Sequence, residues 1–238
     1  MEHDYLIAGL RVRMDSYGRT VDQAEPYMTE TCGDADIVIQ SQAEYFRKQF
    51  PHLSLEDCEY LTTGSSFYQQ LLKFNGMMVH ASAVVMDGFA YLFSAPCGTG
   101  KSTHTSMWRK AFGEDRVQML NDDKPALRFE DGRWYAYGTP WSGKTSQNTN
   151  IRVPLGGICM LTRGETNEIV PFSGVAAAFE LMEQTTRPQI PNARGKLLEL
   201  LDCLLREVPV WKLKCNPTTD AARVSHKAMS EEAQKRFK

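Results

Sequence analysis

Two segments of the chain have residue types and spacing that could bind a phosphate group. The first, Ala95 to Ser102, reads Ala-Pro-Cys-Gly-Thr-Gly-Lys-Ser. It follows the P-loop pattern G-x-x-x-x-G-K-[ST] except that Ala95 replaces the first glycine. The second, Gly138 to Thr145, matches the pattern at every position. Glycines let a loop turn its amides toward phosphate oxygens and the lysine adds positive charge, so each segment predicts a nucleotide site.

The context of the two segments favours the first, because a phosphate cradle needs a strand before the loop and a helix N-terminus after it. Residues 89–94 are apolar and aromatic, which predicts a buried strand. Residues 102–112 lack glycine and proline and place apolar side chains at helical spacing. In the second segment, Pro140 removes an amide, and residues 146–150 are poor helix formers. We therefore expect the nucleotide-binding residues to be Pro96, Cys97, Gly98, Thr99, Gly100, Lys101, Ser102 and Thr103.

Two adjacent aspartates supply the carboxylates that a P-loop reaction needs. In such a loop the lysine contacts the β- and γ-phosphates and the serine hydroxyl contacts Mg²⁺, roles that fall to Lys101 and Ser102. Asp122 and Asp123 follow an apolar run at 117–120, which we expect to be a strand next to the P-loop strand. Neighbouring residues of an extended chain point to opposite sides, so one carboxylate can face the metal ion and the other the acceptor. Taken alone, the same residues are typical of a turn.

A histidine precedes the P-loop within an apolar run. His80 interrupts residues 77–85, which we predict to be one strand. The turn signal Asp87-Gly88 joins this strand to residues 89–94 and predicts a hairpin that would bring His80 near the loop. A buried histidine with a satisfied hydrogen bond and no other role is an equally good interpretation.

The ordered set of these motifs resembles the catalytic core of the HPr kinase/phosphorylase family, whose superfamily includes the ATP-dependent phosphoenolpyruvate carboxykinases. His80-Ala-Ser-Ala-Val precedes the P-loop and Asn121-Asp122-Asp123 follows it, and the resemblance spans roughly residues 77–161. It implies an α/β fold with the mixed-sheet P-loop kinase core of the HPr kinase/carboxykinase type. It also implies one aspartate as base toward a hydroxyl. The implied catalytic residues are His80, Lys101, Asp122 and Asp123, and the implied metal ligands are Ser102, Asp122 and Asp123.

The chain also departs from that family. It lacks a recognisable glycine-rich signature and basic C-terminal loop after the aspartates, which argues against HPr itself as the substrate, against phosphorolysis and against a hexamer. Residues 137–145 resemble instead a segment of small uncharacterised HPr-kinase-like proteins. Lys144 is a candidate for contact with the transferred phosphate or the acceptor, and Asn148 or Asn150 for polar substrate groups. A solvated loop lysine is the alternative interpretation.

The elements around these motifs predict a main domain and a smaller one. The chain has 238 residues, 42% of them hydrophobic. We expect a small N-terminal α+β lobe at 1–75 and an HPr-kinase-like P-loop kinase domain at 76–238. In the lobe we expect a strand at 36–40 and a helix at 64–74. In the domain the pattern adds strands at 125–129, 134–137, 155–161 and 209–214, and helices at 174–184, 196–206 and 219–237.

Charge and hydropathy limit the partners. The formal net charge is −2 and there is no Lys/Arg block, which argues against a nucleic acid or an anionic membrane as partner. A secretory signal and a membrane-spanning apolar run are both absent from the sequence, so we expect a cytoplasmic protein.

These features predict an ATP- and Mg²⁺-dependent kinase that phosphorylates a hydroxyl group, in particular a serine of a peptide or small protein. A small-metabolite kinase and a non-catalytic nucleotide-binding module are the alternatives. A carboxykinase-type lyase fits less well, because such enzymes are about twice as long. GTP in place of ATP, and a homo-oligomer, are both compatible with the sequence.

Overall fold

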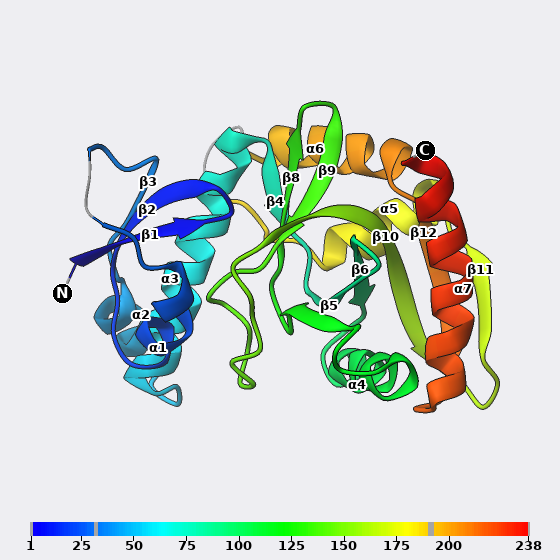
Figure 1. Ribbon diagram of the computed structural model, residues 1–238. Coiled ribbons are helices and arrows are strands. Elements are labelled where there is room, and N and C mark those ends of the chain that lie inside the picture. The colour runs from blue at the N-terminus through cyan, green and yellow to red at the C-terminus, as the bar shows by residue number, and fades with distance from the viewer. Residues whose placement is uncertain (1, 31–32, 190–192, 238) are drawn as a thin grey trace.

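The computed structural model describes residues 2–30, 33–189 and 193–237 and shows an α/β fold (Figure 1). Within these residues, nine strands form a curled, mixed sheet, and three more form a separate small sheet near the N-terminus. The predicted α/β class is confirmed at this level.

The N-terminal part combines a three-stranded sheet with helices. Its elements are β1 (Glu2–Ile7), β2 (Leu10–Asp15), α1 (Arg19–Ala24), the 3-10 helix η1 (Glu25–Tyr27), β3 (Ile37–Ile39), α2 (Ala43–Gln49), α3 (Leu55–Leu71) and the 3-10 helix η2 (Leu72–Phe74). Strand β2 pairs antiparallel with β1 and parallel with β3. The helix predicted at 64–74 is longer than expected and begins at Leu55. Ser54 caps its N-terminus by accepting a hydrogen bond from the Asp57 amide, a capping signal that hydrophobic spacing does not reveal.

The main sheet carries helices on both faces. Its strands are β4 (Gly76–Met78), β5 (Ala81–Met86), β6 (Phe89–Ser94), β7 (Gln118–Asn121), β8 (Ala126–Glu130), β9 (Arg133–Tyr137), β10 (Arg152–Arg163), β11 (Glu168–Pro171) and β12 (Val210–Cys215). Its helices are α4 (Lys101–Phe112), α5 (Gly174–Glu183), α6 (Ala193–Glu207) and α7 (Thr219–Arg236). The predicted hairpin at Asp87-Gly88 is confirmed, and β8 and β9 form a second hairpin with its turn at Asp131-Gly132.

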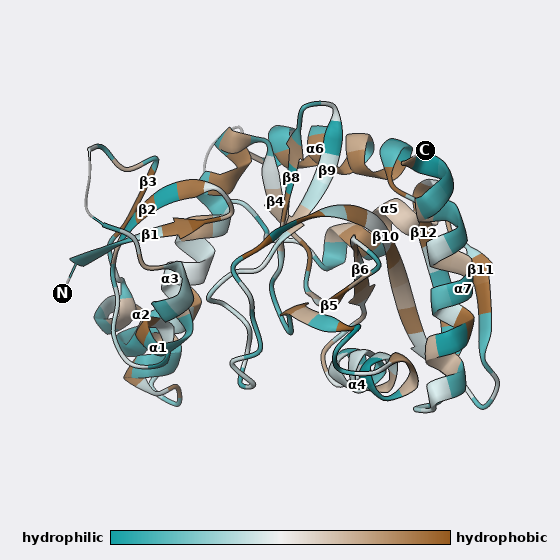
Figure 2. Ribbon diagram, viewed as in Figure 1, coloured by the Kyte–Doolittle hydropathy of each residue, from teal (hydrophilic) through white to brown (hydrophobic). Residues whose placement is uncertain are grey.

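The two faces of β6 explain these layers. Tyr91 and Phe93 lie in the core cluster that contains Trp108 of α4 and Met229 of α7. Leu92, between them in sequence, lies in the cluster that contains leucines of α5 and α6. Successive side chains of a strand point to opposite faces, so an apolar run covered by helices on both sides is apolar at every position. The brown strands between partly teal helices show this arrangement (Figure 2). None of the helices in the described residues has the length and apolar character needed to span a bilayer.

Two expectations for the sheet were wrong. Residues 77–85 are two strands, because the backbone leaves the ladder at His80, whose amide donates to the carbonyl of Gln184 instead. Strand β7 is also not next to β6, the strand before the first P-loop match, because β5 lies between them and pairs antiparallel with both. Two antiparallel pairings leave β6 and β7 parallel to each other, so both strands still end at the same edge of the sheet.

The core of the N-terminal part includes residues from beyond position 75. Phe67 and Tyr68 of α3 pack with Trp141, and Met78 and Ala126 belong to the same cluster of buried side chains. The predicted boundary near residue 75 therefore falls at a place where the two parts share a core, and the division into two domains stays a prediction.

Candidate functional site

The candidate site lies where three neighbouring strands begin or end. Strands β6 and β7 both finish at the edge of the sheet where β5 starts, with Ala81 opposite Ser94 and Ala83 opposite Asn121. His80 directly precedes β5. The loop from Ala95 to Gly100 follows β6, and Asp122 and Asp123 follow β7. The topology thus brings the residues singled out in the sequence to one edge.

The loop after β6 leads directly into the N-terminus of α4. Gly98 and Gly100 have positive φ angles of 78° and 122°, and a Cβ atom added to Gly98 would meet no atom within 4 Å. The space above Gly98 is therefore open to a ligand. Helix α4 begins at Lys101, and the amide of His104 donates to the Gly100 carbonyl. The first amides of the helix thus lie at the end of this loop, which is the arrangement that binds anions.

Lys101 is turned back along the loop. Its Nζ donates to the carbonyl of Ala95 at 3.0 Å, and only 8% of the residue is exposed. Burial lowers the pKa of Lys101, while the nearby carboxylates, Asp123 more than Asp122, act against that effect. Lys101 thus lies within electrostatic reach of both aspartates.

Arg163, at the end of β10, holds the loop from the other side. Its Nε donates to the carbonyl of Thr99 at 3.2 Å and its Nη2 to the carbonyl of Gly98 at 2.5 Å. These bonds direct two loop carbonyls toward the guanidinium. A cavity of about 510 Å³ adjoins this point and is lined by the loop, by α4 and by the ends of β10 and β12. Such a crevice at the carboxyl ends of strands is where open α/β sheets bind ligands.

The two aspartates have separate sets of partners. Ser82 donates to Oδ1 of Asp122 at 2.6 Å, and Thr145 donates to Oδ2 at 2.9 Å. Ser82 also contacts the hydroxyl of Thr105 in α4 at 2.8 Å. Asp122 is thus held by neutral hydroxyls on the side of the sheet edge that faces α4.

Asp123 is held by charged or chargeable partners. Its Oδ1 lies 3.1 Å from Nε2 of His80, and its Oδ2 lies 2.6 Å from Nζ of Lys124. Burial alone would raise the pKa of Asp123, but the hydrogen bond from His80 and the charge of Lys124 outweigh it and lower the pKa to about 2. Asp123 is therefore an anion at neutral pH.

Both ring nitrogens of His80 are engaged. Nε2 faces Asp123, and Nδ1 lies 3.2 Å from Oε1 of Gln184, just past the end of α5. His80 thus has no ring nitrogen directed at a separate substrate atom, and it can act on a substrate through Asp123.

The second P-loop match forms a different structure. Gly138 has no room for a Cβ atom, which would lie 2.0 Å from the Thr149 carbonyl oxygen, and Trp141 is fully buried. After Gly143 the chain makes a turn. Lys144 is exposed in this turn, beside Thr145, which binds Asp122.

The two asparagines named as substrate candidates lie just beyond that turn. Asn148 donates from Nδ2 to the Ser142 hydroxyl at 2.9 Å, and its Oδ1 is buried with no hydrogen-bond partner among the described residues. Asn150 donates to the carbonyl of Pro26. The structure therefore brings His80, Lys101 and the aspartates together. Lys144 is adjacent in sequence to Thr145, which binds Asp122, and both asparagines make contacts within the protein.

Sequence reasoning missed several residues that hold these groups. Ser82 is a hydroxyl within an apolar run close to His80, so the strand pattern contained a signal for it. Gln184 lies far along the chain, just past the end of α5, and nothing local marks it. Only the topology brings it to this edge.

Comparison with known proteins gives one family. The family model described as SynChlorMet cassette protein ScmC matches residues 54–219. A solved structure, the Hpr(Ser) kinase/phosphatase from Coxiella burnetii, matches with 11% identity and a TM-score of 0.40, over 66% of this chain and 91% of that chain. The curated proteins contain no match. Every residue of the site described above, from His80 to Gln184, lies within the segment that the family model matches.

Proposed function

This chain belongs to the family of the SynChlorMet cassette protein ScmC, and we propose that it is an ATP- and Mg²⁺-dependent kinase. The proposed reaction transfers the γ-phosphoryl group to a hydroxyl acceptor. One observation carries the proposal: a glycine-containing loop at a helix N-terminus lies at the same sheet edge as Lys101, Asp122 and Asp123. Phosphoryl transfer asks a protein mainly for positioning and for charge stabilisation, and these groups supply both.

The donor would bind at the loop after β6. Free amides at the start of α4 and the open space above Gly98 suit a phosphate group. Lys101 would exchange its bond to the Ala95 carbonyl for a charge-assisted bond to phosphate. The adjoining cavity of about 510 Å³ offers room for the nucleoside.

The residues present fit Mg²⁺ when a nucleotide shares the site. The described residues contain no group of three His, Cys, Asp or Glu that could hold a metal ion alone. Mg²⁺ suits such a site, because it is usually held by one or two carboxylates together with substrate phosphates and water. Ser102 and Asp122 would be the ligands, since Asp122 faces α4 and its carboxylate accepts from neutral hydroxyls of Ser82 and Thr145. Bound Mg²⁺ would neutralise charge on the transferred phosphate.

Asp123 would serve the acceptor. In the proposed step the acceptor oxygen forms a bond to the γ-phosphorus while the bond from that phosphorus to the bridging oxygen of ADP breaks. The hydroxyl proton passes to the Asp123 carboxylate. A carboxylate with a pKa near 2 is a weak base, so Asp123 would first orient the hydroxyl and take the proton late, once the oxygen has become more acidic. His80 and Lys124 would keep the carboxylate ionised and in place.

We favour a serine of a peptide or small protein as the acceptor. The support is the resemblance of the ordered motifs to a protein-serine kinase family and the presence of an N-terminal part that packs against the site. A small metabolite as acceptor is the alternative that the experiment must separate from a peptide.

The experiment incubates the purified chain with Mg²⁺ and ATP labelled at the γ-phosphate, in separate arms with the peptide fraction and the metabolite fraction of a cell extract. Asp123→Asn serves as the inactive control. We expect label on serine in the peptide arm, and none with the variant. Label on a small sugar, polyol or amino acid alone would replace the acceptor but keep the kinase. No transfer in either arm, together with no nucleotide binding by calorimetry, would overturn the proposal.

A further inference from the structure

Both backbone groups of Gly143 are held by side chains of the N-terminal part. The Gly143 amide donates to the hydroxyl of Tyr60 in α3 at 2.7 Å. The Gly143 carbonyl accepts from Nε2 of Gln23 in α1 at 2.9 Å, and the same Nε2 lies 3.2 Å from the hydroxyl of Ser146. Tyr60 and Gln23 are almost completely buried. Two separate helices thus fix one peptide position in the turn that bears Lys144 and Thr145.

Gly143 in turn packs directly on Asp123. A Cβ atom placed on Gly143 would lie 3.2 Å from Cβ and 3.6 Å from Cγ of Asp123. The φ angle of Gly143 is 77°, a left-handed conformation that glycine adopts without strain. Any movement of this glycine therefore changes the space that the Asp123 side chain occupies.

The surroundings of Tyr60 also lead to Asp123. The ring lies 4.8 Å from Nζ of Lys124, the same nitrogen that binds Oδ2 of Asp123. The guanidinium of Arg19 also lies over this ring, 4.2 Å from the ring centroid. Burial raises the pKa of Tyr60, and the Asp123 carboxylate raises it further. Tyr60 therefore contacts Gly143, lies beside Lys124 and faces the Asp123 carboxylate.

We infer that Tyr60 and Gln23 are positioning residues through which the N-terminal part sets the geometry of Asp123. The inference deepens the proposed function and rests on it for its kinetic consequence. Neither side chain needs to touch the nucleotide or the acceptor. Each acts through Gly143, which bounds the space available to the proposed acceptor-side carboxylate.

The test uses two conservative variants, each with a matched control. Tyr60→Phe removes the hydroxyl but keeps the ring under Lys124 and Arg19. Its control is Tyr5→Phe, because Tyr5 is also buried and its hydroxyl bonds only to Ser16 among the described residues. Gln23→Leu removes the bond to Gly143. Its control is Gln70→Leu, because Gln70 donates to the carbonyl of Val38, also in the N-terminal part.

The kinetic readout separates positioning from general destabilisation. A displacement of about 1 Å can cost on the order of 100-fold in rate, so we expect Tyr60→Phe and Gln23→Leu to lower kcat roughly 10- to 100-fold. The KM for nucleotide should stay within about twofold, since the loop after β6 is untouched. Tyr5→Phe and Gln70→Leu should leave both constants near those of the wild type. Equal losses in variants and controls, or a rise in nucleotide KM without loss of kcat, would overturn the inference.

A second readout needs no turnover. The NMR signal of the His80 Nε2 proton reports on the Asp123 carboxylate, 3.1 Å away. It should shift in Tyr60→Phe and Gln23→Leu and stay unchanged in the two controls. If the wild type transfers no phosphate but these shifts appear, the proposed function fails and the positioning role stands. If the signal stays constant in all four variants, the positioning role is wrong whatever the activity.

Discussion

His80 Nε2 lies 3.1 Å from Asp123 Oδ1, and the other ring nitrogen of His80 faces Gln184. This relationship makes His80 a partner of the carboxylate, so under the proposed function His80 would act on the acceptor through Asp123. Through these two contacts, His80 at the start of β5 joins Gln184 after α5 to Asp123 after β7.

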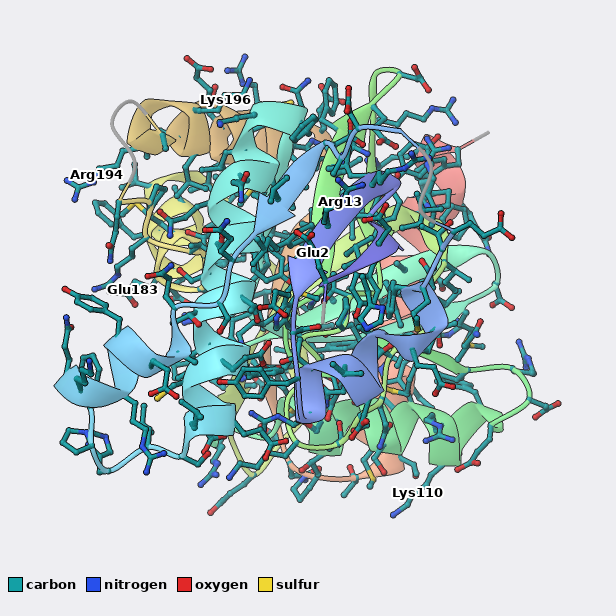
Figure 3. The ribbon with its side chains drawn as sticks, turned by 90° about the vertical axis from the view of Figure 1, so that its left-hand side faces the viewer. Glu2, Arg13, Lys110, Glu183, Arg194 and Lys196 are labelled. Atoms are coloured by element: carbon teal, nitrogen blue, oxygen red, sulfur yellow. The ribbon has the colours of Figure 1, made fainter. Side chains whose placement is uncertain are left out.

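Lys101→Ala should weaken binding of ATP with Mg²⁺. Bonds to charged groups contribute about 1.5–3 kcal/mol, which corresponds to roughly a 10- to 150-fold rise in Kd measured by calorimetry. Lys110→Ala is the matched control, since Lys110 lies on the same helix and points away from the molecule (Figure 3). Lys144→Ala should also leave nucleotide affinity nearly intact. A larger loss with Lys144→Ala than with Lys101→Ala would assign the nucleotide to the second P-loop match.

Asp122→Asn and Asp123→Asn should each abolish most phosphoryl transfer while the protein stays folded. Loss of a base or a metal ligand at such a site lowers the rate by about 10²–10⁴. Asp131→Asn, at the exposed β8–β9 turn, provides the control. Circular dichroism checks the fold and label transfer checks the rate. Wild-type transfer by the double variant would rule out the mechanism.

His104 should make the protein less stable in acid. Burial lowers the pKa of His104 from 6.5 to about 4. The unfolded chain therefore binds more protons between these two values. This contribution to stability is complete above pH 6.5 and is lost as the pH falls toward 4, by about 2 kcal/mol between pH 8 and pH 5. The free energy of unfolding of His104→Gln, measured in urea, should not show this loss between pH 8 and pH 5. The exposed control His52→Gln should show it as the wild type does.

Glu59 should have the opposite effect on stability. Burial raises its pKa from 4.5 to about 7, although Thr20 donates a hydrogen bond to it. Its contribution is complete below pH 4.5 and is lost as the pH rises through 7. Relative to the wild type, Glu59→Gln should therefore gain stability as the pH rises from 5 to 8. For the exposed control Glu44→Gln, the free energy of unfolding in urea should depend on pH as it does in the wild type. The same pH dependence for Glu59→Gln would contradict the prediction.

Glycine-to-alanine substitutions should separate the two P-loop matches. At Gly138 the added methyl group would collide with the carbonyl oxygens of Thr149 and Leu120, so the substitution should destabilise the fold by on the order of 3 kcal/mol or more. At Gly98 the methyl group meets open space, and only the positive φ costs about 1–2 kcal/mol. Gly98→Ala should instead weaken nucleotide binding. Urea unfolding and calorimetry on both variants measure the two effects, and the opposite ranking in either would contradict the assignment.

The sequence predicted those parts of the fold that depend on local patterns. The strand at 89–94, the hairpin turns and the helix after Lys101 have clear periodicity or turn residues, and the structure has them. The strands β1 and β2 were both missed. In β1 the exposed Leu6 stands between the buried Tyr5 and Ile7 and breaks the hydrophobic alternation, whereas β2 alternates regularly and its pattern was overlooked. The break at His80 could not be predicted, because its cause is a hydrogen bond to Gln184, which belongs to a distant helix end.

For the candidate site, the sequence indicated the groups proposed to do chemistry but not those that hold them. Lys101, Asp122 and Asp123 stand in recognisable motifs. Tyr60 and Gln23 do not, because residues that position another from a distant part of the chain are identified only by distance in space. The roles of all these residues stay predictions until the variants above are measured.

Trp141 has a consequence for how the protein unfolds. Its indole stacks on Phe67 with ring centroids 4.9 Å apart and donates to the Thr63 hydroxyl, so a residue of the turn region is buried in the N-terminal part. Separating the two parts would expose a large aromatic surface and leave that donor without its partner. Both parts should therefore melt in one cooperative transition, and a fragment that begins near residue 76 would carry an apolar patch prone to aggregation.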